Sequence, residues 1–414
     1  MRELFQNAGF RRLWASLVAL SLGDALMQMA LLELFHRHHY DERIETAKML
    51  FAVAVPGLLF GPVAMAYLDR WQRRSVLLVS DAFRAFVVLG IVAYVWPLET
   101  GRVEESHLFV VYALIFVVGT MATFYLPARV ALVPNLVPAD KLMQANTLFT
   151  TSIAVAAIGG RALGGFVAEV FGVMAGVAAN VAAYVFSVWC LWRIKMPPHA
   201  TSRDVVGRST GGWSELRTGL AYLWGNALAW RLVWVAAAFA FVGGLLLVEI
   251  VGYAMETLSL RTGGVGYLIG AGGAGAAIGL AICARGPKWV RADWFTPLQL
   301  VVVGAALAGM GLTRQVWVAV PLVVVVGAAA AMAAIHVDAK LQEHVEETRR
   351  GAVFAARGML TSLTTVIAFW LQFGTAVLRR TPAPTVMWWL GLGTMAAGLL
   401  TLAAMRMRVR QSRR

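Results

Sequence analysis

The stretch that decides the fold is Gly61-Pro-Val-Ala-Met-Ala-Tyr-Leu-Asp69-Arg70-Trp71-Gln72-Arg73-Arg74. It places a dense group of charges between two long apolar runs, and Asp81 and Arg84 follow within the second run. Basic residues gather in the short cytoplasmic loops of membrane proteins. The pattern therefore predicts a short cytoplasmic turn between two membrane-spanning helices.

The composition supports a membrane protein throughout. Hydrophobic residues make up 59% of the 414 residues and charged residues only 14%, which is too apolar for a soluble protein. Apolar windows of about 20 residues, the length that crosses a bilayer as a helix, recur along the whole chain. Helices are expected because a spanning backbone must satisfy its own hydrogen bonds in lipid. The sequence therefore predicts an all-α integral membrane protein with about twelve spans.

The charge and the cysteines exclude other classes. The net charge of +14 is concentrated in the predicted cytoplasmic segments and in a basic tail ending at Arg413 and Arg414, which indicates topology and membrane anchoring and not nucleic acid binding. The two cysteines, Cys190 and Cys283, fall within predicted spans and indicate no disulfide framework. The first apolar run carries Asp24 and no small-residue cleavage site, so we expect a retained helix and not a signal peptide.

The spans group into two halves of six. We expect helices near Leu13–Phe35, Ala47–Leu68, Ser75–Trp96, His107–Leu126, Leu148–Val170, Gly172–Ile194, Arg231–Ala254, Gly263–Ala284, Phe295–Leu312, Val316–Ile335, Ala352–Leu378 and Thr385–Met405. A polar segment rich in Pro, Ser, Thr and Gly lies between the halves. The predicted organisation is an N-terminal lobe over 1–194, a cytoplasmic linker with an amphipathic helix over 195–227, and a C-terminal lobe over 228–414.

The two halves also resemble each other in sequence. Met121-Ala122 and Arg129 recur as Met332-Ala333 and Lys340 at one constant offset, and Arg74 recurs as Arg285 at the same offset. Internal repeats of this kind are typical of secondary transporters, whose substrate sites lie between the repeats. A duplicated six-helix unit is therefore favoured over an unrelated channel.

The Asp-Arg-x-x-Arg-Arg turn resembles the loop between the second and third helices of the major facilitator superfamily of transporters. Further matches are Phe124-Tyr-Leu-Pro127-Ala-Arg129-Val-Ala-Leu-Val-Pro134-Asn-Leu-Val-Pro138 and Gly160-Arg-Ala-Leu-Gly164-Gly165, which resemble the branch of the macrolide and enterobactin exporters and the bacterial lysophospholipid transporters. The resemblance implies that Asp69 latches the cytoplasmic side and that the arginines of the turn face the aqueous side. We expect Asp69 to form a cytoplasmic gate cluster with Arg70, Arg73, Arg74, Asp81 and Arg84. Arg161 stands where the family's antiporter motif usually has proline.

Ionisable residues inside the spans are the candidates for substrate binding or proton coupling, because a charge at the bilayer centre is costly. Asp24 lies about 11 residues into the first predicted span, roughly 16 Å deep at a helical rise of 1.5 Å per residue. Gln28 follows one turn later on the same face. Arg161 requires an anion, for which Asp24 is the first candidate and Glu33 the second. Glu249, near the outer end of the seventh span, either faces the cavity as a further candidate or lies at a wet loop end.

Other chemistry finds less support in the sequence. His36, His38 and His39 stand together after the first span and suggest a transition-metal carrier as an alternative. No nucleotide-binding loop, nucleophile elbow or zinc-protease motif is present, so we expect neither an enzyme nor a cofactor.

The resulting expectation is a secondary transporter of the cytoplasmic membrane, with both termini in the cytoplasm, that exports an amphipathic small molecule by alternating access. We expect protons to be the coupling ion. We also expect the protein to be a monomer that contacts membrane lipid. A lysophospholipid flippase of the same fold is one alternative. A transporter-like receptor or scaffold that binds a ligand without flux is another.

Overall fold

In the computed structural model, residues 2–68, 71–96, 105–194, 212–286 and 292–411 are described. Within these ranges, twelve helices are long and apolar enough to cross a membrane, and no strand is present. Asp69 and Arg70 lie outside the described residues. The chain is therefore an all-α, multi-pass membrane protein, as the apolar windows predicted.

The chain divides into two compact units, Met1–Leu216 and Arg217–Arg414. The boundary lies inside the segment 195–227 that the composition marks as a linker. Unit 1 contains α1 (Arg2–Gln6), α2 (Ala8–Arg37), α3 (Glu42–Leu68), α4 (Arg73–Val95), α5 (Glu105–Leu132), α6 (Leu142–Phe171) and α7 (Val173–Trp192). The helix α8 (Gly212–Gly225) crosses the boundary. Its range includes the amphipathic helix expected at the end of the linker.

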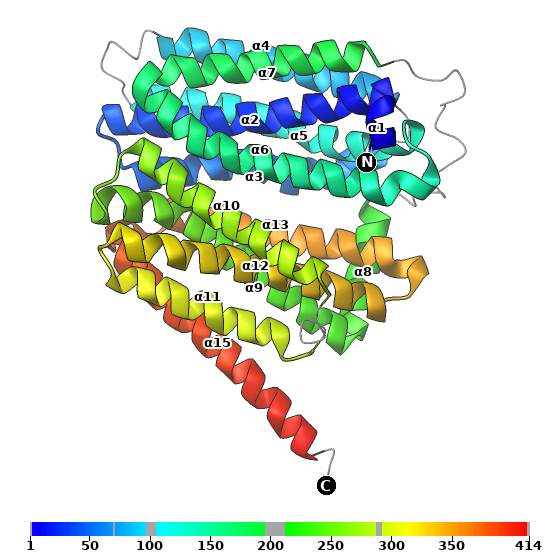
Figure 1. Ribbon diagram of the computed structural model, residues 1–414, viewed down its shortest axis with the longest axis vertical. Coiled ribbons are helices and arrows are strands. Elements are labelled where there is room, and N and C mark those ends of the chain that lie inside the picture. The colour runs from blue at the N-terminus through cyan, green and yellow to red at the C-terminus, as the bar shows by residue number, and fades with distance from the viewer. Residues whose placement is uncertain (1, 69–70, 97–104, 195–211, 287–291, 412–414) are drawn as a thin grey trace. The chain divides into compact units, whose positions relative to one another are not determined.

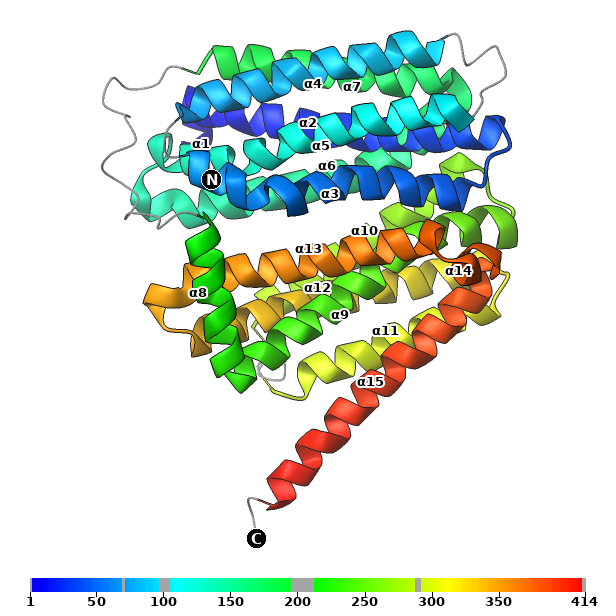
Figure 2. The same ribbon diagram turned by 180° about the vertical axis from the view of Figure 1, so that it is seen from behind.

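The helix α2 is the centre of unit 1, where it packs against both α6 and α7 (Figures 1 and 2). Small residues make this approach possible. A Cβ atom at Gly160 of α6 would lie 2.7 Å from the Cβ of Ala25, and one at Gly176 of α7 would lie 2.6 Å from the Cβ of Ala30. Since real side chains do not approach so closely, glycine at these positions sets the distance of α6 and α7 from α2.

Unit 2 contains α9 (Ala227–Gly252), a π-helical turn η4 (Tyr253–Thr257), α10 (Thr262–Ala284), α11 (Phe295–Leu312), α12 (Val316–His344), the short turn η6 (Glu347–Arg349), α13 (Arg350–Gly374), α14 (Ala376–Arg380) and α15 (Ala383–Gln411). The pairs α11 with α15 and α10 with α12 pack closely (Figure 2). Glycines face each other at both crossings: a Cβ at Gly391 would lie 2.6 Å from the carbonyl oxygen of Gly304, and one at Gly327 would lie 1.9 Å from that of Gly272.

Several helices run further than hydropathy predicted, and α5 and α12 do so at their C-terminal ends. The helix α5 continues past the expected end at Leu126 to Leu132, and α12 continues past Ile335 to His344. At the end of α12, Lys340 Nζ lies 2.8 Å from Asp293 Oδ1, and this hydrogen bond holds the pKa of Asp293 below its usual range. Hydropathy marks where the apolar surface stops, whereas the backbone hydrogen bonds of a helix continue while polar side chains support it.

Candidate functional site

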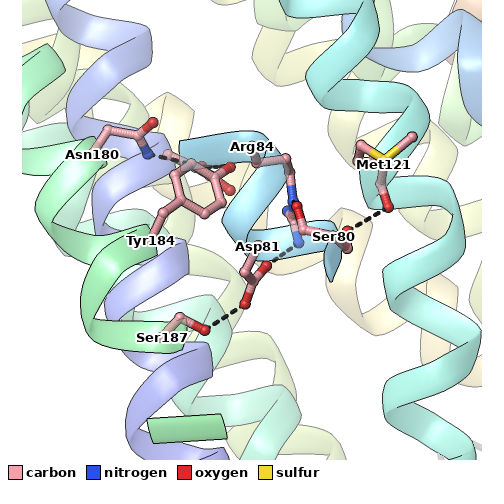
Figure 3. Close-up of polar contacts among 8 residues, drawn as sticks. Ser80, Asp81, Arg84, Met121, Asn180, Tyr184 and Ser187 are labelled. Atoms are coloured by element: carbon pink, nitrogen blue, oxygen red, sulfur yellow. Dashed lines mark hydrogen bonds and ion pairs between the residues drawn. The ribbon is translucent and has the colours of Figure 1, made fainter. Parts of the chain in front are cut away.

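Asp24 lies in α2 and is half-buried. Its Oδ1 atom accepts two hydrogen bonds from α7, one from Asn180 Nδ2 at 3.0 Å and one from the Tyr184 hydroxyl at 2.8 Å (Figure 3). The preceding residue is Gly23, where a Cβ atom would lie 2.6 Å from the Cβ of Ala183. The Gly-Asp pair therefore has a physical basis: the glycine brings α7 close enough for its polar side chains to reach the carboxylate.

A buried ion pair lies next to this contact, between Asp81 and Arg84 of α4 (Figure 3). Asp81 has no exposed surface, Arg84 is 4% exposed, and the hydroxyl of Ser187 in α7 donates to Asp81 Oδ2. The Arg84 guanidinium lies 4.6 Å from the ring centroid of Tyr125 and 5.0 Å from that of Tyr184. Such cation–π contacts are strongest when the cation is removed from water.

Tyr184 joins the two contacts into one network. Its hydroxyl binds Asp24 and its ring faces Arg84, so a single fully buried side chain touches both charged groups. Asp24 is also close enough to attract Arg84 electrostatically. We call Asp24, Asn180, Tyr184, Arg84, Asp81 and Ser187 the polar network of unit 1. If both carboxylates are ionised its net charge is −1, and one bound proton makes it neutral.

This position of Asp81 and Arg84 differs from the cytoplasmic cluster that the sequence suggested. Asp81 lies eight residues after the start of α4, a distance of about 12 Å along the helix. Both side chains point into the packed interior, where α7 supplies their neighbours. The sequence carried a signal for this, since Asn180, Tyr184 and Ser187 recur at helical spacing on α7. None of the three was among the candidate residues predicted from the sequence.

Two arginines of the charged turn, Arg73 and Arg74, bind the ends of neighbouring helices. Arg73 Nη1 donates to the carbonyl oxygen of Ala131 at 2.7 Å, close to the end of α5. Arg74 donates to the carbonyl oxygens of Leu191 at 3.0 Å and Trp192 at 2.5 Å, at the end of α7. The last carbonyls of a helix have no partner within it and carry the negative end of the helix dipole. These two arginines therefore tie the start of α4 to the ends of two neighbouring helices.

Arg161 lies on α6, half-buried, and its Nη1 donates to the carbonyl oxygen of Ala157 at 3.3 Å. It is close enough to Asp24 for electrostatic attraction. Among the described residues the structure shows no ion pair between Arg161 and either Asp24 or Glu33. Glu33 is bound instead by Arg37, one turn away, with Nε 2.7 Å from Oε1. A contact of Arg161 with Asp24, direct or through one water, stays a prediction for another access state.

The remaining candidates are spread over both units. Gln28 lies half-buried one turn after Asp24. Glu249 has no exposed surface in α9, so a wet position at a loop end is excluded. His36 Nδ1 lies 2.8 Å from Glu42 Oε1. In the part of the chain that the structure describes, no three His, Cys, Asp or Glu side chains are grouped to hold a metal ion, the cluster of His36, His38 and His39 included.

Unit 2 has a polar cluster of its own at the end of α12. His336 is buried and its Nδ1 contacts the hydroxyl of Thr296, while Asp338 Oδ1 lies 2.6 Å from Arg357 Nη1 of α13. In the sequence, His336 and Asp338 follow the apolar run that ends near Ile335, which predicts a solvated helix end for both. His336 is enclosed instead, because α12 continues past them and α11 and α13 cover this part of it.

The sequence model of the Major Facilitator Superfamily matches residues 13–369, nearly the whole chain. The chain belongs to the major facilitator superfamily. This transporter therefore shares a family with secondary carriers and not with enzymes, which agrees with the two halves and the charged turn of the sequence.

Three relatives with different names are similar to this transporter in sequence. Rv0037c of Mycobacterium tuberculosis, named only as an MFS-type transporter, is 26% identical over 88% of this chain and 82% of its own length. The lysophospholipid transporter LplT of Photorhabdus laumondii is 23% identical over 91% of this chain and 90% of its own. BacE of Bacillus subtilis, named as a bacilysin exporter, is 27% identical over 42% of this chain and 41% of its own.

Solved structures give the same fold. A bacterial homologue of the iron transporter ferroportin, in an inward-facing state, superposes with a TM-score of 0.70. The superposition covers 95% of this chain and 96% of that one at 16% sequence identity. At this identity the similarity establishes the fold of the transporter and not its substrate.

Proposed function

We propose that this transporter exports an amphipathic small molecule across the cytoplasmic membrane in exchange for protons, by alternating access. The observation that carries the proposal is the polar network of unit 1, which holds Asp24 inside a membrane-spanning bundle with neutral hydrogen-bond donors. A carboxylate inside the membrane is costly and marks a functional pathway.

The hydrogen bonds of Asp24 suit a group that gains and loses a proton. Both bonds end on Oδ1 and both come from groups that donate, Asn180 and Tyr184. A proton can therefore be added at Oδ2 without breaking either bond, because a protonated carboxyl still accepts at its other oxygen. A carboxylate held by a bonded arginine or lysine would have to give up that partner first.

Protonation of Asp24 also changes the force on Arg84. While Asp24 is ionised, two carboxylates attract this guanidinium, and after protonation Asp81 is the one remaining carboxylate of the network that attracts it. A change of one charge in a low-dielectric interior biases the packing of the helices that carry these groups.

Export and an amphipathic substrate are supported by the relatives and not by a bound ligand. BacE is named as an exporter, and LplT is named for a lysophospholipid, which is amphipathic. We propose a monomer in the cytoplasmic membrane with both termini in the cytoplasm, since the basic turn and tail follow the positive-inside rule.

A lysophospholipid transporter is the second candidate. LplT matches along nearly the whole chain, and Arg161 is an intramembrane cation whose contact here is a backbone carbonyl. A guanidinium binds phosphate with two parallel hydrogen bonds. Arg161 would then receive the phosphate of a lysolipid head group.

The test is transport by the purified protein in liposomes. Thermal stabilisation is first measured with a cationic dye, a catecholate siderophore, a transition metal ion and lysophosphatidylglycerol, and each stabilising compound is then used for flux. We expect a proton gradient to drive accumulation of an amphipathic compound. Driven flux of lysophosphatidylglycerol alone would favour the second candidate, and binding without flux of any compound would make the protein a receptor.

A further inference from the structure

Unit 2 contains a polar pocket. It has a volume of about 750 Å³ and lies between α8 and the connection from α12 to α13. Its lining residues are Arg217, Thr218, Ala221, Tyr222, Gly225, Asn226, Glu346 and Arg349. Figure 2 shows α8 running across the direction of α9 and α13.

The α8 wall of the pocket is held by close packing. Gly219 of α8 rests on the first turn of α13, where a Cβ atom would lie 2.0 Å from the carbonyl oxygen of Ala352. Leu223, one turn further, has no exposed surface. Because no side chain fits between the two backbones, α8 keeps a fixed position against α13, and the pocket exists before any ligand binds.

The chemistry of the lining favours an anion. Arg217 and Arg349 are both exposed, and the Arg349 guanidinium lies 5.6 Å from the ring centroid of Tyr222. Asn226 Nδ2 donates to the Tyr222 hydroxyl at 3.3 Å, so the hydroxyl proton of Tyr222 is available to a ligand. Glu346 is the acidic residue of the lining, and its Oε2 atom lies 3.5 Å from Arg349 Nε. Two guanidinium groups and one carboxylate leave the lining with a net positive charge.

The position of the pocket relative to the membrane surface indicates where the anion comes from. Asn226 caps α9 by accepting from the backbone N–H of Leu228 at 3.1 Å and of Ala229 at 3.0 Å, and a candidate membrane span begins at Ala227. Trp224 beside the pocket is 82% exposed, and tryptophan concentrates at the level of lipid head groups. The pocket therefore opens at the surface of the bilayer and not in the bulk solution.

We propose that this pocket binds the phosphate of an anionic phospholipid, with Arg217, Arg349 and the Tyr222 hydroxyl as its ligands. The bound lipid holds α8, which lies at the end of the linker, to the connection between α12 and α13. Each basic group near an anionic membrane surface contributes about 1 kcal/mol. The affinity for the lipid is therefore expected to fall about fivefold for each arginine removed.

The experiment uses the full chain in nanodiscs of phosphatidylcholine with and without phosphatidylglycerol. The readouts are the melting temperature and, after release into the gas phase, the number of phosphatidylglycerol molecules retained in native mass spectrometry. The variants are Arg217→Gln, Arg349→Gln, their combination and Tyr222→Phe. The control is Arg380→Gln, which removes an exposed arginine outside the pocket.

We expect phosphatidylglycerol to raise the melting temperature of the unaltered protein and of Arg380→Gln. In the double arginine variant, phosphatidylglycerol should raise the melting temperature by at most about half as much, and one fewer phosphatidylglycerol molecule should be retained. Equal stabilisation and equal lipid retention in all variants would overturn the site. Stabilisation by inorganic phosphate in pure phosphatidylcholine, matching that by phosphatidylglycerol, would also overturn it, because the pocket would then take a soluble anion.

Discussion

Removing both charges of the Asp81–Arg84 pair should destabilise the protein less than the two single removals added together. Asp81→Asn leaves Arg84, 4% exposed, without its carboxylate. Breaking a buried pair costs about 3 to 5 kcal/mol. The rings of Tyr125 and Tyr184 still face the guanidinium, and each such contact is worth about 1 kcal/mol. We therefore take the lower end of the range, about 3 kcal/mol.

The expected shift in melting temperature follows from the unfolding entropy, about 2.1 cal/mol/K per residue. If the whole chain unfolds as one unit, about 3 kcal/mol lowers the melting temperature by about 3 °C, and if unit 1 unfolds by itself, by about 7 °C. The double variant Asp81→Asn with Arg84→Gln removes both charges. It should recover about 1 kcal/mol or more of the loss expected from the two single changes.

The assay is thermal unfolding of the purified variants in detergent at one fixed scan rate, since membrane proteins often unfold irreversibly. Asp140→Asn is the matched control, because Asp140 is exposed. Its shift should stay within about 1 °C. Additive losses in the double variant would show that the two charges do not support each other, and the reasoning about the network would fail.

Three further predictions concern other parts of unit 1. Asp69→Asn should lower transport and leave substrate binding intact, if Asp69 latches one access state; equal loss of both in flux and binding assays would exclude the latch. A double-mutant cycle of Asp24→Asn with Arg161→Gln should give a coupling of about 1 kcal/mol or more, whereas additive effects would assign Arg161 to the substrate. Gly160→Val should destabilise by about 1 to 3 kcal/mol, since its Cβ would lie 2.7 Å from a side chain of α2, while Gly159→Ala, which faces open space, should be close to neutral in thermal unfolding.

The helices and the two halves were predictable because they depend on local sequence. Apolar windows and charged turns gave the twelve spans, and hydropathy misplaced several helix ends, such as that of α12, which runs on past Lys340, and that of α13, which ends at Gly374. The partners of the buried charges were harder to predict from the sequence. Asp81 and Arg84 looked like an extension of the charged turn, since their distance from it is short along the chain. Their burial depends on how closely α4 and α7 approach, which a single sequence does not state.

The surroundings of Asp24 could be predicted only in part. Its place within the first span could be counted from the sequence, whereas the close approach of α7 at Gly23 was not predicted. Its bonds to Asn180 and Tyr184 required the structure, since they join residues of the first and sixth spans. The predicted partner Arg161 is near Asp24 but not bonded to it, because the helix register directs the guanidinium toward the backbone of its own preceding turn.

Proton-driven flux in liposomes with Asp24→Asn tests the central claim most directly. The unaltered protein should accumulate an amphipathic substrate against its gradient when a proton gradient is imposed. Asp24→Asn should abolish this accumulation and still exchange labelled for unlabelled substrate, because the asparagine keeps the hydrogen bonds and cannot take up the proton. The control Asp140→Asn should behave like the unaltered protein. Full proton-driven accumulation by Asp24→Asn would contradict the account.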